Sequence, residues 1–532
     1  MSDKPNFLFF ITDQHRADYL GCSGHPVLKT PNIDSIAARG RRFDRFYVAN
    51  PVCMPNRSTL MTGRMPSVHG VRHNGIPLSM RANTFTELLR DAGWRTALVG
   101  KSHLQNMTPF GPIMDRPAIN PNHAPPGEGH DEATLPIPGD GPYDQEDPKR
   151  WAHGEFAPMT LPFYGFDHVD LCTGHGDEVG GHYTHWLYQK YDDSESLRGA
   201  ENQLPHDYVC PQAIRTSIPE EHYPTAYIQE KALEYLDQRA ADDQPFFAMV
   251  SFPDPHHPFT PPGKYWDMYK PEDMTLPPSF DHGNRPLPPH LAWAREQLEA
   301  GAAERGGQNT FAVNAREALE AMALTCGMIA MVDDAIGAIL AGLKVHGMDE
   351  NTVVVFTSDH GDFLGDHQLM LKGPAHYHGL IRVPFIWADT PDRASPAGVT
   401  DELSGTIDIA GTILERAALQ PYNGIQGRSL LADTAGDSAQ PDAMLIEADD
   451  QRNYLGFDKP PRLRTLVTRT HRMTIYQGVE WGEIYDLKND PNELDNLWDD
   501  PGSASLRAQL MEILARKQIE LTDRSPFPTA RA

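Results

Sequence analysis

The 532-residue sequence is poor in cysteine: it contains only five, and they are scattered along the chain. No two of them form a Cys-x-x-Cys pair, and an odd number cannot pair completely. We therefore expect neither a disulfide framework nor a structural zinc site. Apart from Cys53, the cysteines are expected to be free thiols: Cys22, Cys172, Cys210 and Cys326.

Positive charge is also scarce. The chain has 46 Lys and Arg residues against 73 Asp and Glu residues, a net charge of -27. Nucleic acid and anionic membrane surfaces would be repelled by this excess, so we expect neither as a partner. An anionic substrate would need a site where positive side chains are concentrated.

Long hydrophobic runs are missing as well. No uninterrupted apolar run reaches the roughly 18 residues that a bilayer span requires. The first apolar run, residues 6–12, is too short for the core of a signal peptide and ends at Asp13. We therefore expect no membrane span and no export signal, and a cytoplasmic location.

The residues that are present alternate between strand-like and helix-like segments. Strands are expected at residues 6–12, 96–100 and 245–252 and from residue 352, and helices at residues 32–40, 84–93, 225–240 and 315–347. This alternation is typical of a sheet with crossover helices, so the fold class is α/β.

Two segments interrupt this pattern. Residues about 105–225 and about 258–310 are rich in Pro, Gly or His, show little periodicity, and are interpreted as functional insertions. Near the end, residues 464–498 alternate apolar and polar positions, which predicts a small antiparallel sheet, and residues 505–521 form an amphipathic helix. We divide the chain into a catalytic domain, residues 1–435, and a C-terminal subdomain, residues 436–532.

Two expected strands end in the same way. One is followed by Asp13 and Gln14, and the other by Asp359 and His360. The carboxyl ends of strands in an α/β sheet form the usual ligand site, so these four side chains can meet there. An aspartate at a strand end can also simply cap a turn. The repeated pattern favours a divalent metal site, because carboxylate and amide oxygens suit a hard cation and the imidazole also permits Mn²⁺.

The stretch CMPNRSTLMTGR, residues 53–64, supplies a third component. Pro55 suits the first turn of a helix, and Gly63 would close it. Cys53 then lies at the helix N-terminus, where a thiolate is stabilised, and Arg57 lies one turn further on. A thiolate nucleophile is the direct interpretation, although a thiolate is a poor neighbour for an oxygen-preferring metal.

This stretch resembles the sulfatase motif, Cys-x-Pro-x-Arg followed by Thr-Gly-Arg. Further blocks of that family occur in the expected order, and together they span nearly the whole chain apart from the two insertions. They are ITDQ (11–14), VGKSHL (99–104), PHHPF (255–259), TSDHGDFLGDH (357–367), MLKG (370–373), RVPFIW (382–387) and EIYDLKNDPNELDNL (483–497).

The resemblance implies an alkaline-phosphatase-like fold, a large mixed sheet flanked by helices with a smaller antiparallel sheet and helix at the C-terminus. It also implies that Cys53 is converted to formylglycine by a formylglycine-generating enzyme. The hydrate of that aldehyde would be both the nucleophile and a metal ligand. The other metal positions match Asp13, Gln14, Asp359 and His360, with Ca²⁺ as the family default and Mn²⁺ as the alternative.

The remaining matched positions imply roles in catalysis. Arg57 would orient the diol, and Lys101 and Lys372 would neutralise the sulfate oxygens. His256 would protonate the leaving oxygen, and His103 would help to break down the covalent intermediate. One diol oxygen would attack sulfur and release the alcohol or phenol, after which the second hydroxyl would expel sulfate and regenerate the aldehyde.

Departures from the common pattern leave alternatives open. The pairs Asp13-Gln14 and Asp359-His360 also resemble phosphonate monoester hydrolases and some choline-sulfatase-like proteins. At Lys101 and His103 the sequence keeps the sulfatase pair, so a small-molecule sulfate ester is the favoured substrate, with promiscuity toward phosphonate and phosphate esters. A phosphonate monoester hydrolase or phosphodiesterase is the alternative, and a sulfatase-fold binding protein without turnover is a remote one.

Several further residues have two interpretations. Asn74 is a candidate substrate contact, but Asn-Gly is also a common turn. His175, His182 and His185 lie in a polar insertion and are expected to be exposed rather than to line the pocket. Because relatives often self-associate, we also expect a homo-oligomer.

Overall fold

A nine-stranded mixed sheet forms the centre of the computed structural model, which describes residues 4–114, 120–124, 141–393, 396–431, 441–525 and 527–531. The strand order is β12-β2-β11-β9-β1-β7-β4-β5-β6. Neighbours from β9 to β5 run parallel, whereas β11 runs antiparallel to β9 and β6 to β5. The strands are β1 (Asn6–Thr12), β2 (Arg41–Phe43), β4 (Arg95–Lys101), β5 (His168–Thr173), β6 (Gly180–Gly181), β7 (Phe246–Ser251), β9 (Thr352–Ser358), β11 (Phe385–Ala388) and β12 (Gly398–Thr400).

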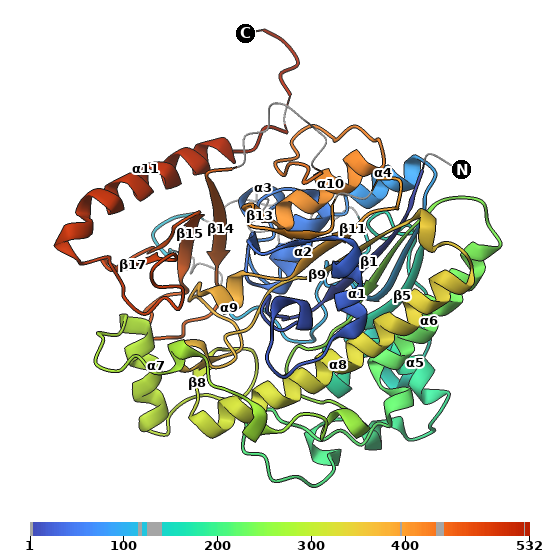
Figure 1. Cartoon of the computed structure of the whole chain (residues 1–532), viewed down its shortest axis with the longest axis horizontal. Coiled ribbons are helices and arrows are strands. Elements are labelled where there is room, and N and C mark those ends of the chain that lie inside the picture. Colours follow the sequence, from blue (N-terminus) through green and yellow to red (C-terminus); the bar gives the residue numbers. More distant parts are fainter. Residues whose placement is uncertain are drawn as a thin grey trace.

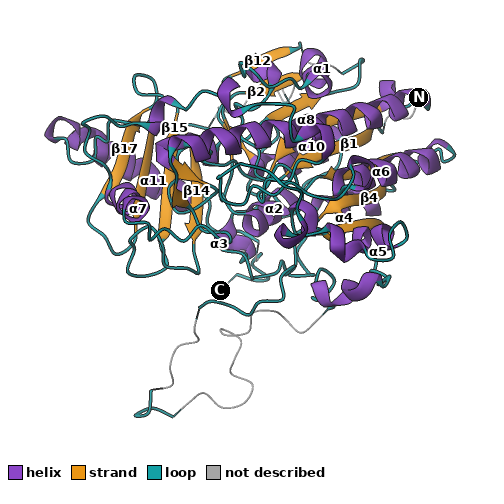
Figure 2. Ribbon diagram, turned by 90° about the horizontal axis from the view of Figure 1, so that it is seen from below, coloured by secondary structure: helices purple, strands orange, loops and turns teal. Residues whose placement is uncertain are grey.

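Helices cover both faces of this sheet (Figures 1 and 2). Successive side chains of β1 point to opposite faces, so Leu8 and Phe10 join one core while Phe7 and Phe9 join the other. Because both faces are buried, the strand is apolar throughout rather than alternating. The first core is closed by α1 (Pro31–Arg39), α6 (Pro224–Ala240) and α8 (Ala315–Val345), and the second by α2 (Cys53–Thr62), α4 (Phe85–Asp91) and α10 (Ile409–Arg416).

Helix α8 is the one helix, among the described residues, that is long and apolar enough to cross a membrane. Of its most apolar stretch, 67% is buried inside the protein. The helix packs against α6 and α1, and Asp333 accepts hydrogen bonds from the backbone of Asn32 and Ile33 at the start of α1. Its apolar surface therefore serves the core of the protein.

The C-terminal residues form a separate antiparallel sheet, as the sequence predicts. Its order is β14-β15-β16-β17, and α11 packs on it through Leu510 and Leu514 (Figure 1, left). The predicted boundary near residue 435 lies outside the described residues. The elements are β14 (Ala443–Asp449), β15 (Arg462–Thr468), β16 (His471–Tyr476), β17 (Gly482–Asp486) and α11 (Ala504–Glu520).

The connections contain more regular structure than the sequence analysis predicts. Residues 105–225 were interpreted as a largely irregular insertion, but they contribute β5 to the main sheet. The short length of β5 explains the difference: it has six residues, and its two half-buried positions are the polar residues His168 and Asp170. The remaining elements are β3 (Phe46–Tyr47), α3 (Pro66–His69), α5 (His182–Tyr188), α7 (Pro289–Glu299), β8 (Phe311–Ala312), β10 (Leu369–Met370), α9 (His378–Ile381) and β13 (Ser404–Gly405).

Strand register decides which residues meet at the carboxyl edge of the sheet. Thr12, the last residue of β1, pairs with Ser358, the last residue of β9. Ser251, the last residue of β7, pairs with Ile11 of β1 and with Gly100 of β4. The residues that follow these strands, together with the end of β4, therefore form one continuous site.

Candidate active site

Two aspartates that follow neighbouring strands form the floor of the site. Asp13 and Asp359 are fully buried, and one oxygen from each lies with Cys53 Sγ and a His360 ring nitrogen in a group whose atoms are all within 4.8 Å of one another. His360 Nε2 is 3.4 Å from Asp13 Oδ1 and 3.7 Å from Asp359 Oδ1. The sequence prediction that these strand ends converge is therefore confirmed by the fold.

Arg57 stands between the two carboxylates. Its Nε donates to Asp359 Oδ2 at 2.7 Å, and its Nη2 lies 3.6 Å from Asp13 Oδ2. Burial and Asp13 raise the pKa of Asp359, although Arg57 opposes them. Burial and Cys53 would also raise the pKa of Asp13, but Lys101 and His256 hold it well below its usual range. Asp13 is thus the more firmly ionised of the pair.

Gln14 presents one unused oxygen in the same region. Its Nε2 lies 2.5 Å from Asp362 Oδ2 and 3.0 Å from His257 Nδ1, whereas its buried Oε1 has no hydrogen-bond partner among the described residues. The amide nitrogen is therefore committed, and the oxygen is left to accept. Two carboxylates, a free amide oxygen and an imidazole make a donor set that fits a divalent cation such as Ca²⁺ or Mn²⁺.

Cys53 is the first residue of α2, as the sequence predicts. Its Sγ lies 3.1 Å from both Lys372 Nζ and His360 Nε2, and 3.8 Å from Asp13 Oδ1. Burial would raise the pKa of the thiol, but Lys372, His360 and Lys101 hold it well below its usual range. An anion at position 53 is therefore stabilised by this site.

Two buried lysines reach the site. Lys101, the last residue of β4, forms an ion pair with Asp13, and its Nζ lies 2.5 Å from His175 Nε2. Lys372 Nζ lies 2.7 Å from His256 Nε2. Both lysines are at most 5% exposed, so solvent screens the interaction of their charges with the surrounding side chains only weakly. They form the concentrated positive site that an acidic protein needs to bind an anion.

His103 lies on the rim of the same cluster. Its backbone N–H, with those of Leu104 and Gln105, donates to the buried carboxylate of Glu146. These three hydrogen bonds stabilise the backbone at His103, where φ is 57°. Burial lowers the pKa of the His103 ring to about 3, although its interaction with Cys53 opposes the shift, so the ring is neutral.

Asn74 contacts helix α2. Its Oδ1 accepts the backbone N–H of Met54 at 3.1 Å, and its backbone oxygen accepts from Gln451 Nε2 at 2.8 Å. The side chain therefore fixes the start of α2 beside Cys53. A direct contact with substrate stays a prediction.

The expectation for the three histidines of the insertion is wrong. His175 is part of the site: its ring stacks on that of His256 with centroids 3.5 Å apart, and it lies 3.7 Å from Asp13 Oδ2. His182 is buried against Phe156, and His185 is partly buried. His175 follows the carboxyl end of β5, as Asp13 follows β1, so recognising residues 168–173 as a strand would have identified it.

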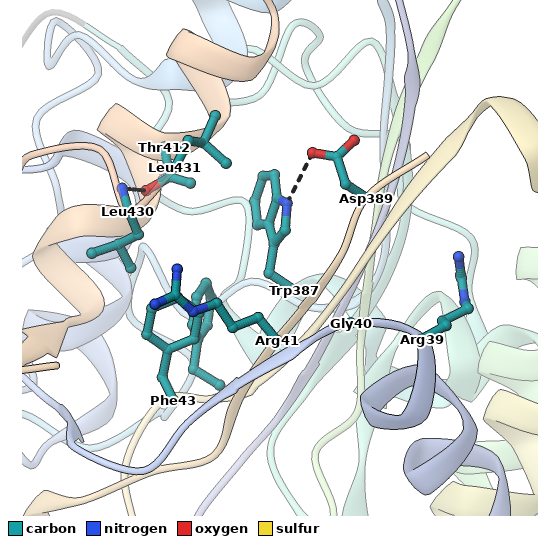
Figure 3. Close-up of a pocket in the computed structure, with 10 residues that line it drawn as sticks. Arg39, Gly40, Arg41, Phe43, Trp387, Asp389, Thr412, Leu430 and Leu431 are labelled. Carbon is teal, nitrogen blue, oxygen red and sulfur yellow. Dashed lines mark hydrogen bonds between the residues drawn. The ribbon is translucent and has the colours of Figure 1, made fainter. Parts of the chain in front are cut away.

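Two further cavities differ greatly in volume. A small cavity of about 20 Å³ at the sheet edge, beside Phe43 and Trp387 (Figure 3), has room for about one water molecule. A larger cavity of about 450 Å³ is walled by Trp293, Tyr454 and Phe457. Tyr454 also packs against Gly373, the residue after Lys372: a Cβ on Gly373 would lie 3.0 Å from Tyr454 Cε2.

Comparison with known proteins identifies this arrangement. The Sulfatase family model matches residues 5–419. The chain belongs to the sulfatase family. A second model, that of the C-terminal region of N-sulphoglucosamine sulphohydrolase, matches residues 365–520 of this sulfatase. The resemblance stated from the sequence motifs is thereby confirmed, and relatives named arylsulfatase and choline-sulfatase support a sulfuric ester hydrolase.

Individual relatives cover almost all of the sulfatase. An arylsulfatase of Clostridium perfringens is 27% identical over 93% of this chain and 90% of its own length. The uncharacterized sulfatase YidJ of Escherichia coli is 27% identical over 98% of this chain and 88% of its own length. The crystal structure of the phosphonate monoester hydrolase of Agrobacterium radiobacter has a TM-score of 0.75 and 25% identity, covering 98% of this chain and 97% of that one. The alkaline-phosphatase/sulfatase-like fold is therefore shown.

We predict that unmodified Cys53 is the single thiolate at neutral pH. Burial raises the pKa of Cys22 to about 11 and raises the pKa values of Cys172, Cys210 and Cys326, so these four stay protonated. Thiolate absorbance near 240 nm, measured on protein made without a maturing enzyme, should correspond to one cysteine. Cys53→Ser should abolish it and Cys326→Ser should leave it unchanged. Equal absorbance in wild type and Cys53→Ser would contradict the prediction.

Proposed function

We propose that this sulfatase hydrolyses small-molecule sulfate esters through a formylglycine formed from Cys53. The observation that supports the proposal most directly is the convergence of Lys372 Nζ and His360 Nε2 on Cys53 Sγ, each at 3.1 Å, at the start of a buried helix. A sulfur ligand fits poorly beside two carboxylates and an amide oxygen, whereas an oxygen at the same position fits well. The conversion of Cys53 removes this mismatch.

The formylglycine hydrate would supply the nucleophilic oxygen and a second hydroxyl that allows sulfate to be expelled. Serine offers no second hydroxyl. Around it, Lys101 and Lys372 would neutralise the negative oxygens of the sulfate group as charge builds up in the transition state. Arg57 would hold residue 53 in place, because it is fixed by Asp359 at 2.7 Å and by Ser251 Oγ at 3.0 Å.

Two histidines would move protons. Burial, His175 and Lys372 lower the pKa of His256 well below its usual range, so the ring needs the negative charge of a bound ester to hold a proton. With the ester bound, His256 would protonate the leaving oxygen. The neutral ring of His103 would accept the proton of the second hydroxyl as sulfate leaves. The cavity walled by Trp293, Tyr454 and Phe457 would take the alcohol or phenol part.

Asp13, Gln14, Asp359 and His360 would hold one divalent metal ion, with residue 53 as a further ligand. We propose Ca²⁺, because most of the donors are oxygens, with Mn²⁺ as the alternative that the imidazole permits. The ion would act as a Lewis acid on the reacting oxygens. A formylglycine-generating enzyme is the required maturation partner, and a homo-oligomer in the cytoplasm is the proposed state.

Phosphonate monoester or phosphodiester hydrolysis is the second candidate. The structural likeness to the phosphonate monoester hydrolase of Agrobacterium radiobacter supports it. Lys101 and His103 favour sulfate, since they match the sulfatase pair. Sulfate, phosphonate and phosphate groups are all tetrahedral and carry negative charge on their oxygens. We therefore propose secondary activity on phosphonate and phosphate esters.

Conversion of Cys53 is the first test. In protein made together with a formylglycine-generating enzyme, mass spectrometry of the tryptic peptide of residues 46–57 should show the Cys53 sulfur replaced by an aldehyde oxygen. Cys53→Ser should become sulfated at most once per chain, because its ester cannot be expelled. An unmodified thiol despite a competent maturing enzyme, or sustained turnover by Cys53→Ser, would remove the basis of the proposal.

Substrate preference is the second test. The converted enzyme should show a higher kcat/KM for 4-nitrophenyl sulfate than for 4-nitrophenyl phenylphosphonate, because two lysines suit the compact sulfate group. The ratio should fall in Lys101→Ala, while the exposed control Lys264→Ala should retain the wild-type ratio. A strong preference for the phosphonate in the wild-type enzyme would reverse the ranking of the two functions.

Metal content is the third test and needs no substrate. Elemental analysis should find about one Ca²⁺ or Mn²⁺ per chain, and Asp359→Asn should lower the occupancy at least about tenfold. A chelator should lower the thermal midpoint of the wild type, because bound ligand stabilises the folded state, but should have little effect on Asp359→Asn. Asp237→Asn, an exposed position, is the control. Unchanged metal content in Asp359→Asn would rule out this ligand set.

A further inference from the structure

A second basic cavity lies at the seam between the main sheet and the C-terminal sheet. Its volume is about 310 Å³, within the size range of small-ligand sites. The walls come from the segment after β1, from α9, and from the loops that follow β15 and β17. Four arginines line it: Arg16, Arg45, Arg382 and Arg469.

Three carboxylates also line the cavity, but all their oxygens are already engaged. Arg16 binds both oxygens of Asp18, at 2.9 and 2.7 Å. Asp366 accepts from Arg16 Nη1 at 2.7 Å through one oxygen and from Ser279 Oγ at 2.8 Å through the other. Glu493 is paired with the buried Arg472 and accepts the backbone N–H of His378. These carboxylates therefore form no ion pair with the remaining arginines, although against burial the charge of Arg16 and, from a longer distance, that of Arg382 lower the pKa of Asp18.

Among the described residues, the other three arginines have no carboxylate within ion-pair distance. Arg45 Nη1 donates to the backbone oxygen of Arg469 at 2.7 Å. Arg382 Nη1 has a long contact of 3.5 Å to the backbone oxygen of Asp44, and its buried Nε has no hydrogen-bond partner. Arg45 and Arg382 are half-buried without an ion pair, which costs free energy that a bound anion would offset, whereas Arg469 is exposed at the mouth of the cavity.

We propose that this cavity binds a tetrahedral oxyanion, a sulfate or phosphate group. Guanidinium groups match such oxyanions through paired N–H donors. In a chain with a net charge of -27, three unpaired arginines around one cavity provide the opposite sign where an anion can enter. The volume exceeds that of a bare sulfate ion, and Pro277, Leu487 and Pro491 add apolar wall, so the group can arrive free or on a small organic molecule.

The cavity is separate from the catalytic cluster, and the proposal does not depend on the proposed function. None of the metal, lysine or histidine positions assigned above to catalysis lines it. It borders that site through Arg16, which also donates to the backbone oxygens of Asp362 and Phe363, in the loop that follows His360.

Crystals of the full chain soaked in selenate, a sulfate analogue with an anomalous signal, test the position directly. We expect an anomalous peak between Arg45, Arg382 and Arg469, whatever is found at the catalytic site. A peak confined to the catalytic cluster, or no peak in the cavity, would overturn the proposal.

Calorimetric titration with sodium sulfate at constant ionic strength tests binding in solution. The double variant Arg382→Gln/Arg469→Gln should weaken binding at this site about tenfold or more, as expected for lost charged hydrogen bonds. Arg462→Gln, which makes the same change outside the cavity, should bind like the wild type. Because Arg469 is exposed, the single variant Arg469→Gln provides a folded comparison and should show part of the loss. Sulfate binding that is equal in all four proteins would contradict the proposal.

Titration with 1-butanesulfonate, which no ester hydrolase can cleave, separates the two sources of the oxyanion. Tighter binding than that of sulfate, lost in the double variant, would support an oxyanion carried on an organic group. Weaker binding would support the free ion. A failure of formylglycine formation or of ester hydrolysis would leave the selenate position unaffected, so the two proposals fail independently.

Discussion

The active site depends on one buried cation that ties a helix to three strand ends. Arg57 donates to Asp359 after β9, to the backbone oxygen of Lys101 at the end of β4, and to Ser251 at the end of β7. Without it, two buried carboxylates would lie close together, and Asp359 would lose its ion pair. A lysine at this position could not replace it, because one ammonium cannot reach three elements in the geometry of a planar guanidinium. The position of Cys53, one turn earlier in α2, follows from this docking.

Positive charge is concentrated at the active site of this protein. The chain carries a large negative excess, yet Lys101, Lys372 and Arg57 are each at most 5% exposed and lie within one cluster. Because little water surrounds these three buried cations, their electrostatic attraction for an anion is strong within the site. Water screens that attraction at the surface of the protein. The acidic exterior therefore does not prevent anion binding; it leaves the buried cluster and the cavity at the seam as local exceptions.

Much of this arrangement could be predicted from the sequence, where chemistry and periodicity agree. The strand at residues 6–12 and the helix at residues 225–240 correspond closely to β1 and α6, because their apolar patterns are long and uninterrupted. Asp13, Cys53 and Asp359 can be identified because each stands at the end or start of such an element.

The order and direction of the strands in the sheet could not be predicted. Strand β11 is antiparallel to β9, and only the register shows that Thr12 lies beside Ser358. His175 was missed because β5 is short and lies in a polar region, and the pairing of Gln14 with His257 and Asp362 depends on contacts between distant segments.

All ten residues of α2 are buried, and Cys53 itself is 1% exposed. Its first turn is held by Asn74 and its interior by Arg57, so a second protein cannot surround the Cys53 side chain while α2 is packed. Any enzyme that acts on this residue must reach it while the segment is still extended. If Cys53 is converted as proposed, conversion would have to precede the packing of α2. A chain that folded first would keep its cysteine for as long as α2 stays packed, so the proportion of converted molecules would depend on the relative rates of modification and folding.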